Sequence, residues 1–185
     1  LEALRMSSPH HPLEEEGDIF RELGDLYTKR GHIELARKMY KKALDIFSKR
    51  SSLTGEAKVL TSLGALYFEE GKMEQSLGCC QRAYKTAVRL KENRLKATLL
   101  SNMGIVFSVA GDIRKATLCY KKSLAQHKKI GNLLGISQVY HNLGMAMRAL
   151  GKYSSALKYF KRSITLSKKL GEKNLQAISL LSLSD

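Results

Sequence analysis

The segment HNLGMAMRALGKYSSALKYF, residues 141–160, recurs in outline at a fixed spacing of forty residues. Residues 101–120 read SNMGIVFSVAGDIRKATLCY, residues 61–80 read TSLGALYFEEGKMEQSLGCC, and residues 21–40 read RELGDLYTKRGHIELARKMY. The four segments align in rows of forty without a gap. Self-similarity at a fixed period of roughly 20–50 residues is typical of repeat proteins, in which each repeat packs mainly against its neighbours.

Two columns of glycine indicate a helix–turn–helix plan in every row. A glycine inside a helix costs about 1 kcal/mol relative to alanine, so a recurring one calls for a structural reason. We expect the first column to let a second helix lie close, and the second column to end the first helix with left-handed backbone angles. The first column is Gly24, Gly64, Gly104 and Gly144, and the second is Gly31, Gly71, Gly111 and Gly151.

The apolar residues around these glycines follow helical spacing. Phe20, Leu23 and Tyr27 are three and four residues apart, which places them on one face of a helix. After the second glycine, a small residue is followed four residues later by an aromatic residue or a cysteine, as in Ala36 and Tyr40. Each row therefore predicts a helix, a turn at glycine, and a second helix packed closely against the first.

These motifs resemble the tetratricopeptide repeat (TPR) family, whose pattern is aromatic-x-x-Leu-Gly-x-x-Tyr followed by Ala-x-x-x-aromatic. FRELGDLY at residues 20–27 and ARKMY at residues 36–40 fit that pattern. The resemblance implies an all-α fold, a right-handed superhelical solenoid of antiparallel helix pairs. The usual TPR period is about 34 residues. The longer repeats here are similar to those of Pins/LGN-type scaffolds, although LGD, LGA, MGI and LGM replace the LGN motif.

The forty-residue register also predicts where the repeats begin and end. We expect the sequence to be part of a longer array, because AISLLSLSD at its end lacks the polar character of a terminal cap. The predicted parts are the end of a preceding second helix at residues 1–8, an inter-helix loop at 9–15, repeats at 16–53, 54–93, 94–133 and 134–173, and the first helix of a fifth repeat at 174–185.

Composition and motifs favour a non-enzymatic intracellular protein. The sequence has no phosphate-binding glycine loop, nucleophile elbow or zinc-binding helix motif, so we expect no catalytic residues, no cofactor and no metal site. Three cysteines without framework spacing predict free thiols in a reducing cytoplasm. No apolar run approaches the roughly 18 residues of a membrane span, so we expect no transmembrane segment.

The TPR resemblance implies that the first helices line a concave groove that binds a peptide or helix of a partner protein. Residues 18, 21 and 25 make the start of this groove charged (Asp18, Arg21 and Asp25), whereas later rows supply apolar anchors and amides. A carboxamide both donates and accepts, which suits the backbone of an extended peptide. Carried over by register, the predicted groove residues are Phe68, Ser101, Asn102, Ile105, Val109, Gln138, His141, Asn142, Met145, Arg148 and Ile178.

A stripe of cations follows the second helices, which the family places on the convex side. The net charge is +15, and residues 101–185 hold fourteen Lys or Arg against three Asp or Glu. The stripe is either a solvated outer face, with cations favoured near helix C-termini, or a docking surface for an anionic partner. Its members, paired at a spacing of seven residues, are Lys121, Lys122, Lys128, Lys129, Lys161, Arg162, Lys168 and Lys169.

Three functions are therefore open at this point. The favoured one is a protein-interaction scaffold that binds a peptide or helix in the groove. The second is binding of an acidic protein, an anionic membrane surface or nucleic acid through the stripe, although few aromatic residues interleave it for base stacking. The third is a regulatory TPR segment that controls another domain of a longer protein.

Overall fold

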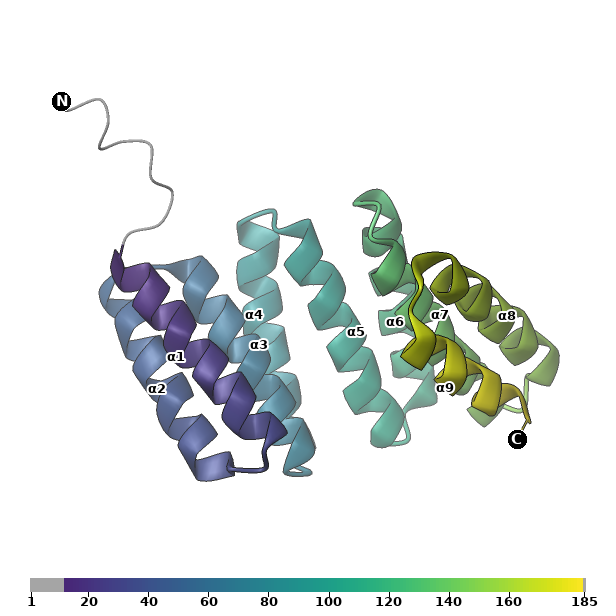
Figure 1. Ribbon diagram of the computed structural model, residues 1–185, viewed down its shortest axis with the longest axis horizontal. Helices are drawn as coiled ribbons and strands as arrows, with labels where there is room; N and C mark the ends of the chain where they lie inside the picture. The colour runs from purple at the N-terminus through teal and green to yellow at the C-terminus, as the bar shows by residue number, and fades with distance from the viewer. Residues whose placement is uncertain (1–11, 185) are drawn as a thin grey trace. The chain divides into compact units, whose positions relative to one another are not determined.

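The computed structural model describes residues 12–184, without the side chains of residues 12–14, 183 and 184 (Figure 1). Within that range the chain forms nine α-helices and no strand, which confirms the predicted all-α fold. None of these helices is long and apolar enough to cross a membrane. The helices are α1 (Pro12–Lys29), α2 (Ile33–Lys49), α3 (Leu53–Glu69), α4 (Met73–Arg89), α5 (Asn93–Val109), α6 (Ile113–Lys129), α7 (Leu133–Ala149), α8 (Tyr153–Leu170) and α9 (Lys173–Ser184).

These helices belong to two compact units, Leu1–Thr86 and Ala87–Asp185. In the first unit, α1 packs against both α2 and α3, and α2 packs against α3. In the second unit, α5 packs against α6 and α7, while α7 packs against α8 and α9. The first helices of successive repeats therefore contact one another inside each unit.

The first glycine column allows the close helix approach that the sequence predicts. In the second pair, a Cβ added to Gly64 would lie 3.0 Å from the Sγ of Cys80. In the other three pairs the added Cβ would overlap an aromatic ring, so the absence of a side chain is required for the observed packing. These pairs are Gly24 with Tyr40, Gly104 with Tyr120, and Gly144 with Phe160.

The turns within and between helix pairs both use left-handed backbone angles. The second glycine column ends the first helices with φ between 69° and 83°, as predicted, at Gly31, Gly71, Gly111 and Gly151. A further column at the turns between pairs was not predicted from the sequence, because only half of its members are glycine. Its members are Ser51 (φ 52°), Lys91 (φ 58°), Gly131 (φ 66°) and Gly171 (φ 71°).

The observed helix boundaries differ from the predicted repeat boundaries at several points. Helix α1 begins at Pro12, so the predicted loop at residues 9–15 is wrong for residues 12–15. Proline is well suited to a first helical turn, where its missing N–H has no helical partner in any case. Residues 1–11, which include the predicted helix end at 1–8, lie outside the described residues. The later first helices begin one residue before the predicted repeats, at Leu53, Asn93, Leu133 and Lys173.

Candidate functional site

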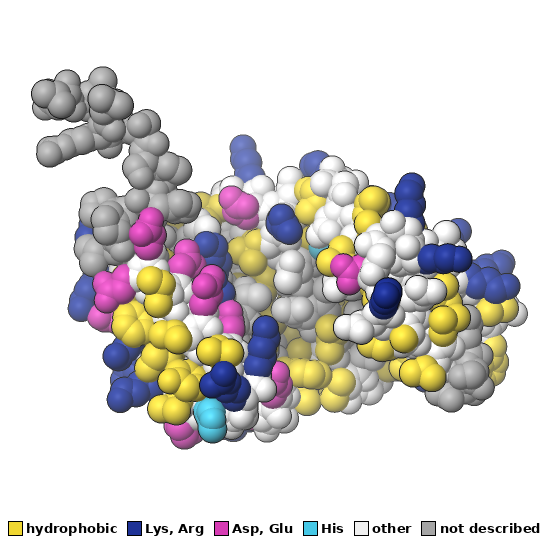
Figure 2. Space-filling model, viewed as in Figure 1, with side chains coloured by type: hydrophobic (Ala, Val, Ile, Leu, Met, Phe, Trp, Pro, Cys, Tyr) yellow, Lys and Arg dark blue, Asp and Glu magenta, His cyan; other side chains and the backbone are white. Residues whose placement is uncertain are grey.

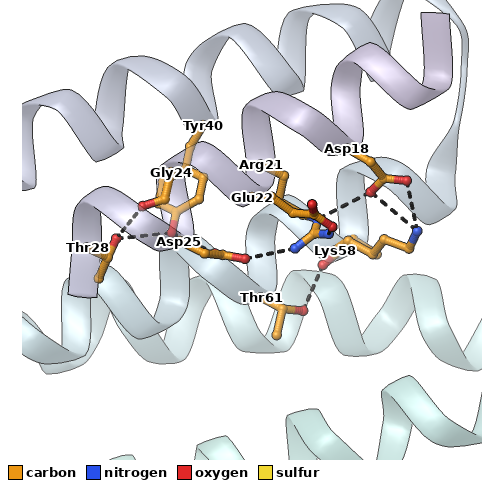
Figure 3. A network of polar contacts seen from close by, with 10 residues as sticks. Asp18, Arg21, Glu22, Gly24, Asp25, Thr28, Tyr40, Lys58 and Thr61 are labelled. Atoms are coloured by element: carbon orange, nitrogen blue, oxygen red, sulfur yellow. Dashed lines mark hydrogen bonds and ion pairs between the residues drawn. The ribbon is translucent and has the colours of Figure 1, made fainter. Parts of the chain in front are cut away.

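The first helices of the N-terminal unit carry a network of charged side chains (Figure 3). The Arg21 guanidinium donates to Asp25 Oδ2 at 2.8 Å and to Asp18 Oδ1 at 3.2 Å. It also contacts Glu22, and the Lys58 ammonium of α3 lies 3.3 Å from Asp18. The charged groove positions that the sequence predicts here are therefore already paired with one another.

Tyr40 connects this network to the buried core of the unit. Its hydroxyl donates to Asp25 Oδ1 at 2.8 Å and lies 3.1 Å from Thr28 Oγ1. Thr28 in turn donates to the carbonyl of Gly24. Burial, together with the Asp25 carboxylate, raises the pKa of Tyr40, so the phenol stays a hydrogen-bond donor. The network thus holds α1 against α2 and is part of the packing of the pair.

A second surface, in the C-terminal unit, is hollowed and carries no acidic group among the side chains that line it. The hollow has a volume of about 440 Å³. Arg94 is the only Lys or Arg in its lining, and Leu134 and Leu175 add apolar area. Six predicted groove residues come together around it, three from α5 and three from α7: Ser101, Asn102, Ile105, Gln138, His141 and Asn142.

Apart from Arg94 and the hydroxyl groups of Thr98 and Ser101, the polar groups of this hollow are amides and imidazoles. Asn102 and Asn142 are half-buried and come from different helices, so their carboxamides can present donors and acceptors from two sides. The Nδ1 of His141 lies 3.1 Å from Ser179 Oγ of α9. Burial, and to a lesser extent Arg148, lowers the pKa of His141. At neutral pH this wall of the hollow is therefore polar and uncharged.

His127 lines the same hollow, although the sequence did not identify it as a site residue. Its side chain is 5% exposed, and its Nδ1 has no hydrogen-bond partner among the described residues. The imidazole lies on Gly135 of the next helix, where any Cβ would overlap the ring. Phe47 lies on Gly55 in the same way in the N-terminal unit. A glycine eight residues after a large second-helix residue is the sequence signal that could have found this contact.

The other five predicted groove residues do not line the hollow. Val109, Met145 and Ile178 are exposed, on α5, α7 and α9 respectively. The remaining two make other contacts or lie in the other unit: Arg148 donates to the carbonyl of Ser182 at 3.3 Å, and Phe68 is half-buried on α3. The structure thus brings six of the eleven residues together.

The basic stripe is exposed along its whole predicted length. On α8, three of its eight members, Lys161, Arg162 and Lys169, line a shallow hollow of about 410 Å³ together with Tyr140 of α7. The Arg162 guanidinium lies 5.7 Å from the centre of the Tyr140 ring, within cation–π distance. Cations and one aromatic ring therefore gather at this point of the stripe.

Within residues 12–184, the cysteines and potential metal ligands form no reactive centre. Cys79, Cys80 and Cys119 are free thiols, as predicted. Burial raises the pKa of Cys80 to about 11, which disfavours the reactive thiolate. Among the described residues, no group of three or more His, Cys, Asp or Glu side chains is placed to hold a metal ion.

Comparison with known proteins finds repeat families and repeat structures. A family model described as Tetratricopeptide repeat matches residues 55–129 and 118–169, and a second model with the same description matches residues 22–50. No curated protein matches the chain.

Several solved structures share the arrangement of helices. Aspartyl phosphate phosphatase F from Bacillus subtilis is 18% identical, with a TM-score of 0.84 over 95% of this chain and 47% of that one. A Rap protein complexed with competence and sporulation factor is 18% identical, with a TM-score of 0.80 over 96% and 49%. BtubC (BKLC) from P. vanneervenii is 20% identical, with a TM-score of 0.75 over 89% and 68%. At these identities the likeness shows the fold, and the chain spans about half the length of the first two.

Proposed function

This chain belongs to the tetratricopeptide repeat family, and from that premise we propose that it is a non-catalytic interaction module whose hollow between α5 and α7 binds an extended peptide segment of a partner protein. One observation carries the proposal: amide side chains from two helices converge on a hollow that has no acidic lining residue. The structurally similar Rap protein, which was solved in complex with competence and sporulation factor, supports a ligand-binding role for such a stack.

The chemistry of the hollow suits a polypeptide backbone. An extended peptide offers alternating N–H donors and C=O acceptors, and each must be paired when it leaves water. The carboxamides of Asn102, Gln138 and Asn142 can pair with both kinds of group. Ile105 and Leu134 supply apolar surface for a side chain of the ligand. Because most of these contacts are uncharged, binding should depend weakly on salt.

A second candidate function uses the basic stripe. The convergence of Lys161, Arg162 and Lys169 beside Tyr140 favours an anionic partner at that point. Binding of this kind would weaken steeply as salt concentration rises, because exposed charges are screened. Salt dependence therefore separates the two candidates.

The test is selection of peptides from a displayed random library, followed by fluorescence anisotropy of the best peptide at about 0.1 and 0.5 M salt. We expect Asn102→Ala with Asn142→Ala to weaken the affinity roughly 10- to 100-fold, because two hydrogen-bonding groups are lost. The matched control removes two exposed amides outside the hollow, Gln81→Ala with Asn174→Ala, and should leave the affinity unchanged.

One outcome would sink the peptide proposal. If the Asn102 and Asn142 variant binds normally, while Lys161→Glu with Arg162→Glu and Lys169→Glu abolishes a salt-sensitive interaction, the basic surface is the binding site. Circular dichroism of each variant would establish that its helix content is unchanged.

A further inference from the structure

The hollow lined by α5 and α7 contains a cation that no acidic side chain neutralises. Arg94, the second residue of α5, is exposed and forms no ion pair with any described residue. Arg21 of α1, by contrast, contacts three carboxylates. In Figure 2, acidic side chains gather over the N-terminal unit, whereas Lys and Arg predominate over the C-terminal unit. An unpaired guanidinium in such surroundings favours an anionic group of a ligand.

The first turn of α7 lies near this cation. Asn132 and Gly135 line the hollow together with Arg94. His127 connects the two, because its ring packs on Gly135. Burial, and to a lesser extent the charge of Arg94, lowers the pKa of His127. The guanidinium of α5 and the start of α7 are therefore both close to one imidazole.

Helix α7 presents hydrogen-bond donors at this point. Asn132 caps the helix, because its Oδ1 accepts from the N–H of Gly135 at 3.0 Å, and its amino group stays free to donate. The N–H groups of Leu133 and Leu134 have no partner among the described residues. Free N–H groups at a helix N-terminus, together with the helix dipole, favour an anion.

His127 supplies an independent sign that a ligand binds here. Its side chain is 5% exposed, and its Nδ1 has no partner among the described residues. Nδ1 is one of the ring atoms nearest to Gly135, so it faces the first turn of α7. A buried polar atom without a partner calls for an explanation, and a group bound at this point would supply one. Since the torsion about the Cβ–Cγ bond of histidine is broad, a small turn of the ring would bring this nitrogen to such a group.

We propose that the hollow selects peptides that carry an acidic side chain, Asp or Glu, whose carboxylate binds between Arg94 and the first turn of α7. The inference rests on the proposed function, because it names a residue of the peptide that the hollow binds. The carboxylate accepts from the guanidinium, from the amino group of Asn132 and from the free N–H groups of α7. One guanidinium matches the single charge of a carboxylate, whereas a phosphate group carries nearly two charges.

Peptide selection is the first test. The library displays random peptides that are joined through their C-termini to a coat protein, so no free C-terminal carboxylate can occupy the site. We expect Asp or Glu to be enriched at one position of the peptides that the whole chain selects. Arg94→Glu should instead enrich Lys or Arg at that position, because the charge of the site is reversed. The matched control, Arg114→Glu, changes the exposed second residue of α6 outside the hollow and should select the same peptides as the unaltered chain.

Fluorescence anisotropy then measures the contribution of the carboxylate. The probes are the best selected peptide and its analogue, in which Asn or Gln replaces the acidic residue. We expect the unaltered chain to bind the analogue roughly 20-fold more weakly. With Arg94→Leu the difference should fall to about threefold, the preference that the helix dipole alone provides. His127→Phe should weaken the acidic peptide several-fold more than the analogue.

The hollow variant separates this inference from the proposed function. Asn102→Ala with Asn142→Ala should weaken both peptides by the same factor, because the amides pair with the peptide backbone. Selected peptides that need both asparagines but carry no preferred acid would overturn this inference and leave the proposed function intact. Peptides that need the acid and Arg94 but neither asparagine would support this inference and overturn the backbone pairing. Selection of no peptide at all would overturn both.

Two further results would overturn the inference. The first is a peptide with phosphoserine in place of the acid that binds more than roughly tenfold tighter, which would assign the site to a phosphoryl group. The second is acid-dependent binding that Arg94→Glu leaves unchanged and that Lys161→Glu with Arg162→Glu abolishes, which would place the acid on the basic stripe.

Discussion

The two units build the same helix pairs but present different first-helix surfaces. Position 22 in the N-terminal unit is Glu22, whose carboxylate contacts Arg21 within an ionic network. The same column in the C-terminal unit holds Asn102 and Asn142, which line a hollow without an acidic lining residue. Paired charges have their strongest partners already, whereas amides in a hollow keep donors and acceptors for a ligand. The position in the repeat decides where a side chain lies, and the neighbouring side chains decide whether it is free to bind a ligand.

The largest effect that we expect distinguishes the second helix pair of the N-terminal unit from a pair of the C-terminal unit, at the first glycine column. Gly104→Ala should lower the free energy of unfolding by about 2 kcal/mol or more, because the new methyl group overlaps the buried ring of Tyr120. Gly64→Ala should change the free energy of unfolding by less than about 1 kcal/mol. The new Cβ would lie 3.0 Å from the Sγ of Cys80, and alanine favours the helix more than glycine does. Urea unfolding of both variants measures the difference. Equal losses would show that the two pairs pack alike.

The next effect concerns the large residue that lies on a glycine of the following helix. His127→Phe should raise the free energy of unfolding by about 1 kcal/mol, because it removes a buried nitrogen without a partner. Phe47, on Gly55, shows that the fold accommodates phenylalanine in this register. The reciprocal change, Phe47→His, should lower the free energy of unfolding by a similar amount or more. Opposite signs in thermal unfolding support the comparison, and a loss in both would contradict it.

His127→Phe should also change how the free energy of unfolding depends on pH. Burial, and to a lesser extent Arg94, lowers the pKa of His127. Below a pH of about 6.5, the unfolded chain therefore binds a proton that the folded chain does not. The free energy of unfolding should fall as the pH drops from 7 toward 5, and His127→Phe should reduce that fall. The part that persists is expected from His141, whose pKa burial also lowers.

The smallest effect concerns the turns between helix pairs. Ser51→Gly should raise the free energy of unfolding by about 0.5–1 kcal/mol, because serine has a Cβ that disfavours a φ of 52°. Gly131→Ser, the matched change in the other unit, should lower it by about 1 kcal/mol. Differential scanning calorimetry compares the two. A stabilising Gly131→Ser would show that this column does not need left-handed angles.

Much of the fold follows from local spacing. The pairing of Gly104 with Tyr120 was predictable, because residues sixteen apart in a helix–turn–helix with a known turn position face each other. Lys91 shows the limit of that reasoning. Its left-handed φ of 58° is imposed by the connection between two helix pairs, and a lysine at this position does not reveal it in the sequence. Residue type predicts a left-handed turn only where the position holds glycine in every repeat.

The candidate site was only partly predictable from the sequence, because α5 and α7 contribute different repeat positions to the lining of the hollow. Residues forty apart occupy equivalent positions in successive repeats, and this correctly grouped Asn102 with Asn142 in the hollow. Ile105 also lines the hollow, but the equivalent residue of the next repeat, Met145, does not. One column contributes to this hollow from α5 but not from α7. His127 was missed for a related reason, since its position depends on the space that Gly135 leaves in the next helix. The fit of a large side chain on one helix to a glycine on the next depends on both helices, so the residue pattern of one helix does not reveal it.

The contact of Phe47 with Gly55, and of His127 with Gly135, implies that consecutive repeats are not interchangeable. In the intervening junctions the sizes are reversed: a small buried residue is followed eight positions later by leucine, at Ala87 and Leu95 and again at Ser167 and Leu175. Deleting one forty-residue repeat would oppose Phe47 to Leu95, whereas deleting two would oppose it to Gly135. The residue sizes at these positions therefore alternate with a period of eighty residues. We expect deletion of two repeats to preserve the match of sizes that deletion of a single repeat would break.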